Sequence, residues 1–112
     1  MNTPADSTVH PIGPNTNALR QLVPEVAERL KAKGLMLATA ESCTGGGLSY
    51  WLTSLPGSSA WFDRGFVTYS NAAKMDMLGV NALTLDTHGA VSEAAAREMA
   101  EGALRNSRAN LS

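Results

Sequence analysis

One feature of the sequence constrains the fold most. A short apolar run is followed by small polar residues and glycines, and these lead into a second apolar segment. The run Leu35–Ala38 predicts a buried strand, and Leu48–Leu52 predicts a helix. Between them lies Thr39-Ala40-Glu41-Ser42-Cys43-Thr44-Gly45-Gly46-Gly47. Such a turn brings side-chain oxygens and free backbone N–H groups to one point, which suits an anion or a developing oxyanion. The segment therefore predicts a site in which Ser42 is either a nucleophile or a helix cap.

The remaining sequence predicts alternating helices and strands behind a polar tail. Residues 1–14 contain three prolines and one glycine and are expected to form a mobile tail, with a single domain over 15–112. Helices are expected at about 15–33, 44–55, 70–77 and 93–106, strands at 35–40 and 62–69, and a turn at 56–59. Pro24 should start or kink the first helix, and residues 80–90 match no element clearly.

The composition limits the classes of partner. Nine basic and ten acidic residues give a formal net charge of −1 without a basic run, which argues against nucleic acid or an anionic membrane. The single cysteine excludes an internal disulfide and argues against a zinc cluster. No apolar run approaches the ~20 residues that span a bilayer, and no signal-peptide pattern is found. We therefore expect a cytoplasmic protein.

The predicted sheet is thin for an α/β protein. Two strands among four helices fall short of the roughly four to six strands of a typical sheet. The sequence stops at 109–112, where another strand could begin. From this pattern we expect a fragment. Because exposed sheet edges pair readily with other chains, such a fragment could borrow strands from a second copy as a homo-oligomer.

Five blocks of sequence, in this order, carry a family resemblance. They are Ala40-Glu41-Ser42-Cys43-Thr44-Gly45-Gly46, Pro56-Gly57-Ser58-Ser59, Val67-Thr68-Tyr69-Ser70-Asn71-Ala72-Ala73-Lys74, Leu78-Gly79-Val80 and Gly89-Ala90-Val91-Ser92-Glu93. Together they resemble the CinA C-terminal domain family over residues 15–112. The resemblance implies a three-layer α/β/α fold with a mostly parallel or mixed sheet. Family members continue into further strands that this sequence does not contain, so we expect the sheet to be incomplete.

The resemblance also implies a reaction, since the characterised family members are nicotinamide-nucleotide amidohydrolases. It implies hydrolytic deamidation of nicotinamide mononucleotide to nicotinic acid mononucleotide and ammonia, in pyridine-nucleotide salvage, without metal or cofactor. By position in the motifs, the catalytic serine, tyrosine and lysine fall on Ser42, Tyr69 and Lys74. A non-catalytic nucleotide-binding module, or an inactive family member, is the alternative function.

The residues themselves offer few bases that could activate Ser42. A Ser–His–Asp arrangement would need His88, and nothing in the spacing supports it. Lys74 could act if its amine is uncharged, which its apolar sequence neighbours (Ala72, Ala73, Met75 and Met77) would favour. Tyr69 could relay a proton or orient that amine through its hydroxyl. Thr44, Gly45 and Gly46 could then hold the oxyanion or a phosphate, and Glu41 could pair with Lys74 or bind a ribose hydroxyl.

Simpler explanations exist for the same residues. Ser42 and Thr44 would cap the following helix, and Lys74 would be a surface lysine. Ser70, four residues before Lys74, is a rival partner for it, although a helix cap explains Ser70 better. Cys43 would be a nucleophile only with a depressed pKa. Asp86, His88 and Glu93 have no recognised metal-ligand spacing.

Overall fold

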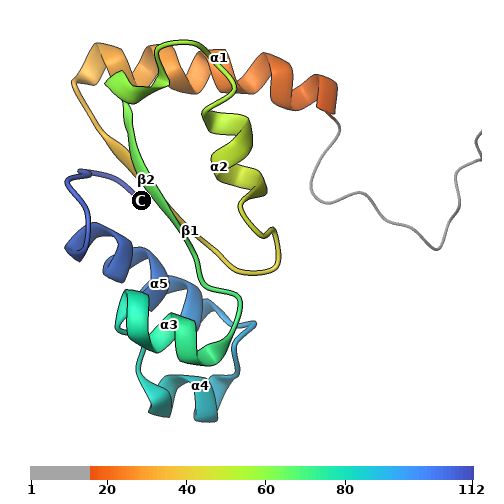
Figure 1. Ribbon diagram of the computed structural model, residues 1–112, viewed down its shortest axis with the longest axis vertical. Coiled ribbons are helices and arrows are strands. Elements are labelled where there is room, and N and C mark those ends of the chain that lie inside the picture. Colours follow the sequence, from red (N-terminus) through yellow and green to blue (C-terminus); the bar gives the residue numbers. More distant parts are fainter. Residues whose placement is uncertain (1–15) are drawn as a thin grey trace, which may run out of the picture.

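The computed structural model of the protein describes residues 16–112, so the predicted tail at 1–14 lies outside the described residues. The elements are α1 (Thr16–Lys33), β1 (Leu37–Glu41), α2 (Gly47–Leu52), a 3-10 turn η1 (Ser58–Ala60), β2 (Phe62–Val67), α3 (Asn71–Leu78), α4 (Ala82–His88) and α5 (Glu93–Arg105) (Figure 1). Every predicted helix and strand has a counterpart, but the helix expected at 44–55 is shorter and residues 80–90 contain α4.

Helices cover both faces of a small parallel sheet. β1 and β2 pair in parallel, with α2 in the connection between them. α1 and α2 lie on one side of the strands, and α3, α4 and α5 lie on the other (Figure 1). This arrangement confirms the predicted α/β class with helices on two faces.

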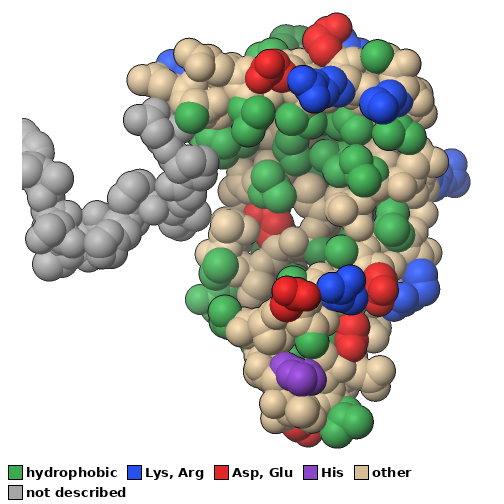
Figure 2. Space-filling model, turned by 180° about the vertical axis from the view of Figure 1, so that it is seen from behind, with side chains coloured by type: hydrophobic (Ala, Val, Ile, Leu, Met, Phe, Trp, Pro, Cys, Tyr) green, Lys and Arg blue, Asp and Glu red, His purple; other side chains and the backbone are tan. Residues whose placement is uncertain are grey.

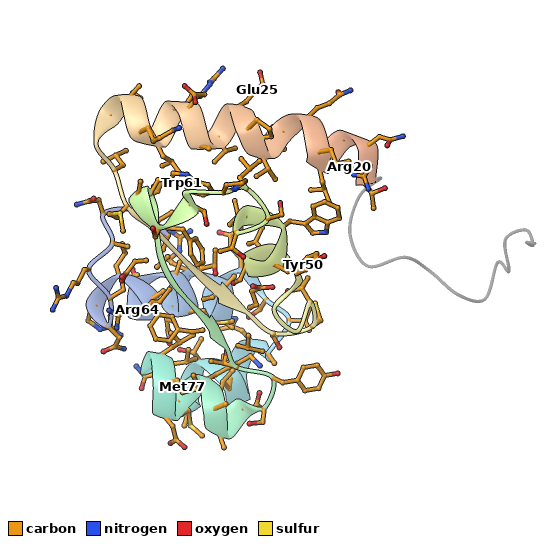
Figure 3. All side chains as sticks on the ribbon, turned by 45° about the horizontal axis from the view of Figure 1, so that its top comes forward. Arg20, Glu25, Tyr50, Trp61, Arg64 and Met77 are labelled. Atoms are coloured by element: carbon orange, nitrogen blue, oxygen red, sulfur yellow. The ribbon has the colours of Figure 1, made fainter. Side chains whose placement is uncertain are left out.

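The core on the α1 side is built by one stripe of α1. Ala27 and Leu30 are buried against Leu52 of α2 and Trp61. Figure 3 shows Trp61 beneath α1, whereas Glu25 points away from the sheet. The charged side chains of α1 gather along its outer side, and hydrophobic ones gather below it (Figure 2). Pro24 neither starts nor ends this helix, since α1 continues on both sides of it.

The core on the other side joins β1 to α3, α4 and α5. Its buried members are Ala38, Leu78, Val80, Leu85, Ala95, Met99 and Ala103. Helices α3 and α5 meet closely, because a Cβ added at Gly102 would lie 2.0 Å from the backbone oxygen of Leu78. Only glycine fits at this crossing, so Gly102 sets how near α5 approaches the helix that carries Lys74.

An irregularity in β2 places apolar side chains of this strand in the cores on both sides of the sheet. Leu37 pairs with Phe62 and Ala38 pairs with Arg64, so Asp63 is an extra residue opposite β1. Phe62 therefore joins the core on the α1 side, whereas Phe66 joins the core on the other side. The Asp63 carboxylate accepts the backbone N–H of Arg108 at 2.9 Å, and this bond lowers the pKa of Asp63.

Leu111 forms a parallel bridge to Leu37 on the edge of β1 away from β2. The N–H of Ala38 donates to the carbonyl of Leu111 at 2.9 Å, and the N–H of Asn110 donates to the carbonyl of Met36 at 2.8 Å. Residues 109–112 therefore begin strand-like pairing, where the sequence suggested the start of another strand. β1 has neighbours on both sides at this end.

Candidate active site

The carboxyl ends of the two parallel strands form the site. β1 ends at Glu41, and the N–H of Thr68, just after β2, donates to the carbonyl of Glu41 at 2.8 Å. Thr68 is fully buried at this junction. Ser42 and the backbone of residues 68–69 are therefore neighbours, although they are far apart in the sequence. Ligands in open α/β sheets bind at this end of the strands.

Lys74 reaches this junction from α3. Its Nζ lies 3.1 Å from the Oγ of Ser42, 3.0 Å from the carbonyl oxygen of Thr68 and 3.2 Å from the carbonyl oxygen of Tyr69. The residue is only 1% exposed. It forms no ion pair within residues 16–112. A buried lysine amine thus has one hydroxyl and two carbonyl oxygens as its neighbours.

The methionines next to Lys74 in the sequence, which were expected to help bury its amine, are themselves exposed. Met75 and Met77 are 37% and 42% exposed, because neighbours in a helix sequence point in other directions. Ser70 sets the start of α3 instead: its Oγ accepts the N–H of Ala73 at 3.0 Å. Ser70 is therefore the predicted cap, and Ser42 is the hydroxyl that contacts the amine.

Tyr69 contributes differently from the sequence expectation. Its backbone carbonyl accepts from Lys74, whereas its side chain is 74% exposed. Its phenol forms no hydrogen bond to Ser42 or Lys74 within the described residues. The expected link between this hydroxyl and the amine is therefore absent from the described residues.

Glu41 neither pairs with Lys74 nor faces solvent. Its carboxylate accepts the hydroxyl of Thr44 at 2.6 Å and the N–H of Leu48 at 2.9 Å through Oε1, and the N–H and hydroxyl of Ser49 at 2.9 and 2.7 Å through Oε2. Burial alone would raise the pKa of Glu41, but these bonds outweigh it and the pKa is lowered. The expected salt bridge to Lys74 is therefore wrong.

The first N–H groups of α2 are therefore bonded to the Glu41 carboxylate of the same chain. Gly46 is the N-cap residue, and neither Ser42 nor Thr44 caps the helix with its side chain. Gly45 and Gly46 have φ angles of 57° and 102°, a region that glycine tolerates, and they delay the helix until Gly47. This loop explains why α2 begins later than the sequence pattern indicated.

Some backbone donors of the loop are free. The N–H of Gly45 donates to the carbonyl of Ser42 at 3.0 Å, so it belongs to a turn. Within residues 16–112, the N–H groups of Cys43, Thr44 and Gly46 have no acceptor. These three donors, beside Ser42, are the groups that could hold an anionic oxygen.

The other predicted candidates lie apart from the pair. His88 ends α4, and it makes no hydrogen bond to Ser42 in the described part of the chain. Cys43 is an exposed free thiol. Residues 16–112 contain no group of three or more His, Cys, Asp or Glu side chains arranged for a metal.

The sequence matches the model of the CinA C-terminal domain over residues 19–112. The chain belongs to the CinA C-terminal domain family. Nicotinamide-nucleotide amidohydrolase PncC of Escherichia coli K12 is 56% identical to it over 92 residues, which cover 82% of this chain and 56% of that protein. A CinA-like protein of Syntrophobacter fumaroxidans is 54% identical over 99 residues, which cover 88% of this chain and 23% of that protein.

Solved structures of CinA-family proteins have the same fold. The competence/damage inducible protein of Agrobacterium tumefaciens superposes with a TM-score of 0.81 at 50% identity, over 90% of this chain and 60% of that one. A CinA superfamily protein of Escherichia coli gives a TM-score of 0.81 at 38% identity, over 97% of this chain and 62% of that one. The chain thus spans little more than half the length of the curated PncC relative and about 60% of these solved chains.

One hollow in the described part of this CinA-family chain lies apart from the Ser42–Lys74 pair. It has a volume of about 320 Å³ and runs along the edge of β1 between α2 and α5. Its lining is mostly apolar and comprises Leu37, Ala38, Thr39, Ala40, Leu48, Leu52, Ala96, Met99, Ala100 and Ser112. Within residues 16–112, no helix has the length and apolarity needed to cross a membrane.

Proposed function

We propose that this chain supplies the catalytic Ser42–Lys74 pair of an amidohydrolase. Its substrate is nicotinamide mononucleotide, and the products are nicotinic acid mononucleotide and ammonia, a step of pyridine-nucleotide salvage. The name and identity of the Escherichia coli relative support the reaction and the substrate. The buried amine 3.1 Å from a serine hydroxyl is the observation that carries the mechanism.

The surroundings of the amine suit a base. Carbonyl oxygens only accept hydrogen bonds, so the two hydrogens of an uncharged amine go to Thr68 and Tyr69. Its lone pair then faces Ser42, the one neighbour with a proton to give. A buried charge without a partner is costly, and Lys74 has no carboxylate partner within residues 16–112.

The reaction then proceeds in two halves. Lys74 takes the proton of Ser42 as the Oγ attacks the carboxamide carbon, and the carbonyl oxygen becomes an oxyanion. The C–N bond breaks, and ammonia leaves with the proton that Lys74 returns. Water attacks the resulting ester, with Lys74 accepting one of its protons and returning it to Ser42. Nicotinic acid mononucleotide is released.

The free N–H groups of the loop stabilise the oxyanion. Cys43, Thr44 and Gly46 offer backbone donors that make no other bond within residues 16–112. Loss of one such donor typically costs about 3–4 kcal/mol of transition-state stabilisation. The side chain of Tyr69 is 74% exposed and makes no hydrogen bond to the amine within residues 16–112, so it would contact the substrate instead.

The test measures ammonia release from nicotinamide mononucleotide by the full-length protein. We expect Ser42→Ala to lower kcat by about 10⁴-fold or more, as removal of a nucleophile does in other serine enzymes. Ser70→Ala is the matched control, because it removes a hydroxyl that caps α3 without contacting the amine. This control should stay within about threefold of the parent, since a lost cap costs only about 1 kcal/mol of stability.

Two outcomes would contradict the proposal. Activity of Ser42→Ala close to that of the parent would exclude Ser42 as the nucleophile. Saturable binding of the mononucleotide without ammonia release by the parent would favour a nucleotide-binding module instead.

A further inference from the structure

The carboxylate of Glu41 is the most fully hydrogen-bonded acidic group in the described part of the chain, and the proposed reaction gives it no role. It is 3% exposed and accepts four hydrogen bonds. Three of these bonds join the residue before Ser42 to Leu48 and Ser49 of α2, and the fourth joins it to Thr44 within the loop.

Glu41 holds both ends of the loop that carries Ser42. Glu41 is the last residue of β1, and its backbone carbonyl accepts the N–H of Thr68 at 2.8 Å. Its side chain accepts the N–H groups of Leu48 and Ser49, in the first turn of α2. One residue therefore ties together the strand end, the helix start and Thr68, whose carbonyl accepts a hydrogen bond from Lys74.

A second layer holds the carboxylate in turn. The hydroxyl of Ser49 donates to Glu41 and lies 2.9 Å from the hydroxyl of Thr39 on β1. Gly65 of β2 leaves room for this contact, because a Cβ there would lie 2.2 Å from the Oγ of Ser49. The network therefore reaches from α2 across both strands.

We propose that Glu41 is a positioning residue that fixes the Ser42–Gly46 loop so that the Oγ of Ser42 lies against the amine of Lys74. This inference rests on the proposed function and departs from the sequence expectation that Glu41 binds substrate. Both oxygens of its carboxylate accept two hydrogen bonds each, from Thr44, Leu48 and Ser49. Its lowered pKa is consistent with an ionised carboxylate that these donors stabilise.

Glu98 offers a matched control within the same molecule. Its carboxylate also anchors a helix start, accepting the N–H of Asn81 at 2.8 Å and the hydroxyl of Thr84 at 2.6 Å before and within α4. The hydrogen bonds from Thr84 and Asn81 lower its pKa too. Glu98 belongs to α5 and has no contact with the catalytic pair among its hydrogen bonds.

The experiment compares Glu41→Gln with Glu98→Gln in the full-length protein. Each variant is assayed for ammonia release from nicotinamide mononucleotide, and for unfolding by denaturant. We expect Glu41→Gln to lower kcat by about 10- to 100-fold, because small misplacements of reacting groups cost that much. KM should change by less than about threefold, since no contact with substrate is lost. Glu98→Gln should lose stability and keep kcat within about twofold.

Ser49→Ala provides a second, milder variant in case Glu41→Gln does not fold. It removes one of the four donors to the carboxylate, and we expect a drop in kcat of about three- to tenfold with KM unchanged. A raised KM with unchanged kcat would make Glu41 a substrate ligand and overturn the inference. Unchanged kinetics, or an equal loss of kcat in Glu98→Gln, would overturn it as well. Inactivity of the parent protein would instead count against the proposed function.

Discussion

The two halves of the candidate site are held in place by different means. Lys74 lies on α3, which a serine cap begins and Gly79 ends, so its position is set within one short segment. Ser42 lies on an irregular loop whose shape depends on a carboxylate that bonds residues three to eight positions away. The lysine half is therefore locally determined, and the serine half depends on a buried polar network. Substitutions behind the two halves should have different consequences.

The largest effect is expected at Lys74 itself. Lys74→Met retains the buried stem but removes the base, so we expect kcat to fall by about 10³-fold or more while the far-ultraviolet circular dichroism is unchanged. Lys74→Arg introduces a fixed positive charge and cannot serve as a base. It should be equally inactive, whereas substantial activity in Lys74→Arg would mean that a fixed charge is sufficient.

The second prediction concerns Gly102, behind the lysine half. A Cβ there would lie 2.0 Å from the backbone oxygen of Leu78, and backbone cannot move aside as a side chain can. We expect Gly102→Ala to lower the free energy of unfolding by about 3 kcal/mol or more. Denaturant unfolding measures it, with Glu101→Ala on the exposed side of α5 as a control close to the parent. A cost under about 1 kcal/mol would show that α3 and α5 can separate freely.

The third prediction concerns Gly65, behind the serine half. An added Cβ would lie 2.2 Å from the Oγ of Ser49 and 2.7 Å from the Oγ1 of Thr39, and both are ends of side chains. We expect Gly65→Ala to cost only about 1–2 kcal/mol of stability, because these hydroxyls can move. Since the moved Ser49 hydroxyl no longer supports Glu41, kcat should fall further than in Gly102→Ala. The reverse order of kcat would remove the distinction between the two halves.

The smallest expected effect is a difference in pH dependence between the Glu41 carboxylate, which supports the loop of Ser42, and the Ser70 cap, which begins the helix of Lys74. The pKa of Glu41 is lowered, so its contribution to stability is present above the ordinary pKa of glutamate and is lost as the pH falls through the folded value. The serine cap does not titrate there. The cost of Glu41→Gln should therefore stay constant near neutral pH and shrink as the pH falls below about 4, whereas the roughly 1 kcal/mol cost of Ser70→Ala should not. Equal pH dependence in unfolding curves would contradict this difference.

Local signals in the sequence were sufficient for the elements whose determinants are nearby. Ser70 and Ser92 accept N–H groups three residues later, as a cap does, and both helix starts are predicted correctly. The segment that contains α4 was not assigned, because its anchor, Glu98, lies 14 to 17 residues away on α5. A cap that comes from another helix leaves no pattern at the helix it stabilises.

The same limit explains what the sequence could indicate about the site. Ser42 and Lys74 are 32 residues apart, and only the family resemblance paired them. That both follow neighbouring parallel strands is a physical reason for the pairing. No sequence pattern indicated that Tyr69 offers its carbonyl to the amine, or that the carboxylate of Glu41 turns inward, because both depend on the assembled fold.

The proposed mechanism requires Ser42 to become covalently attached to the substrate. The most direct measurement is mass spectrometry of the full-length protein, acid-quenched within its first turnover of nicotinamide mononucleotide. We predict the mass of a nicotinic acid mononucleotide ester on the peptide that contains Ser42, together with one ammonia for each ester, and neither in Ser42→Ala. A burst of ammonia from the parent without any adduct on that peptide would contradict it.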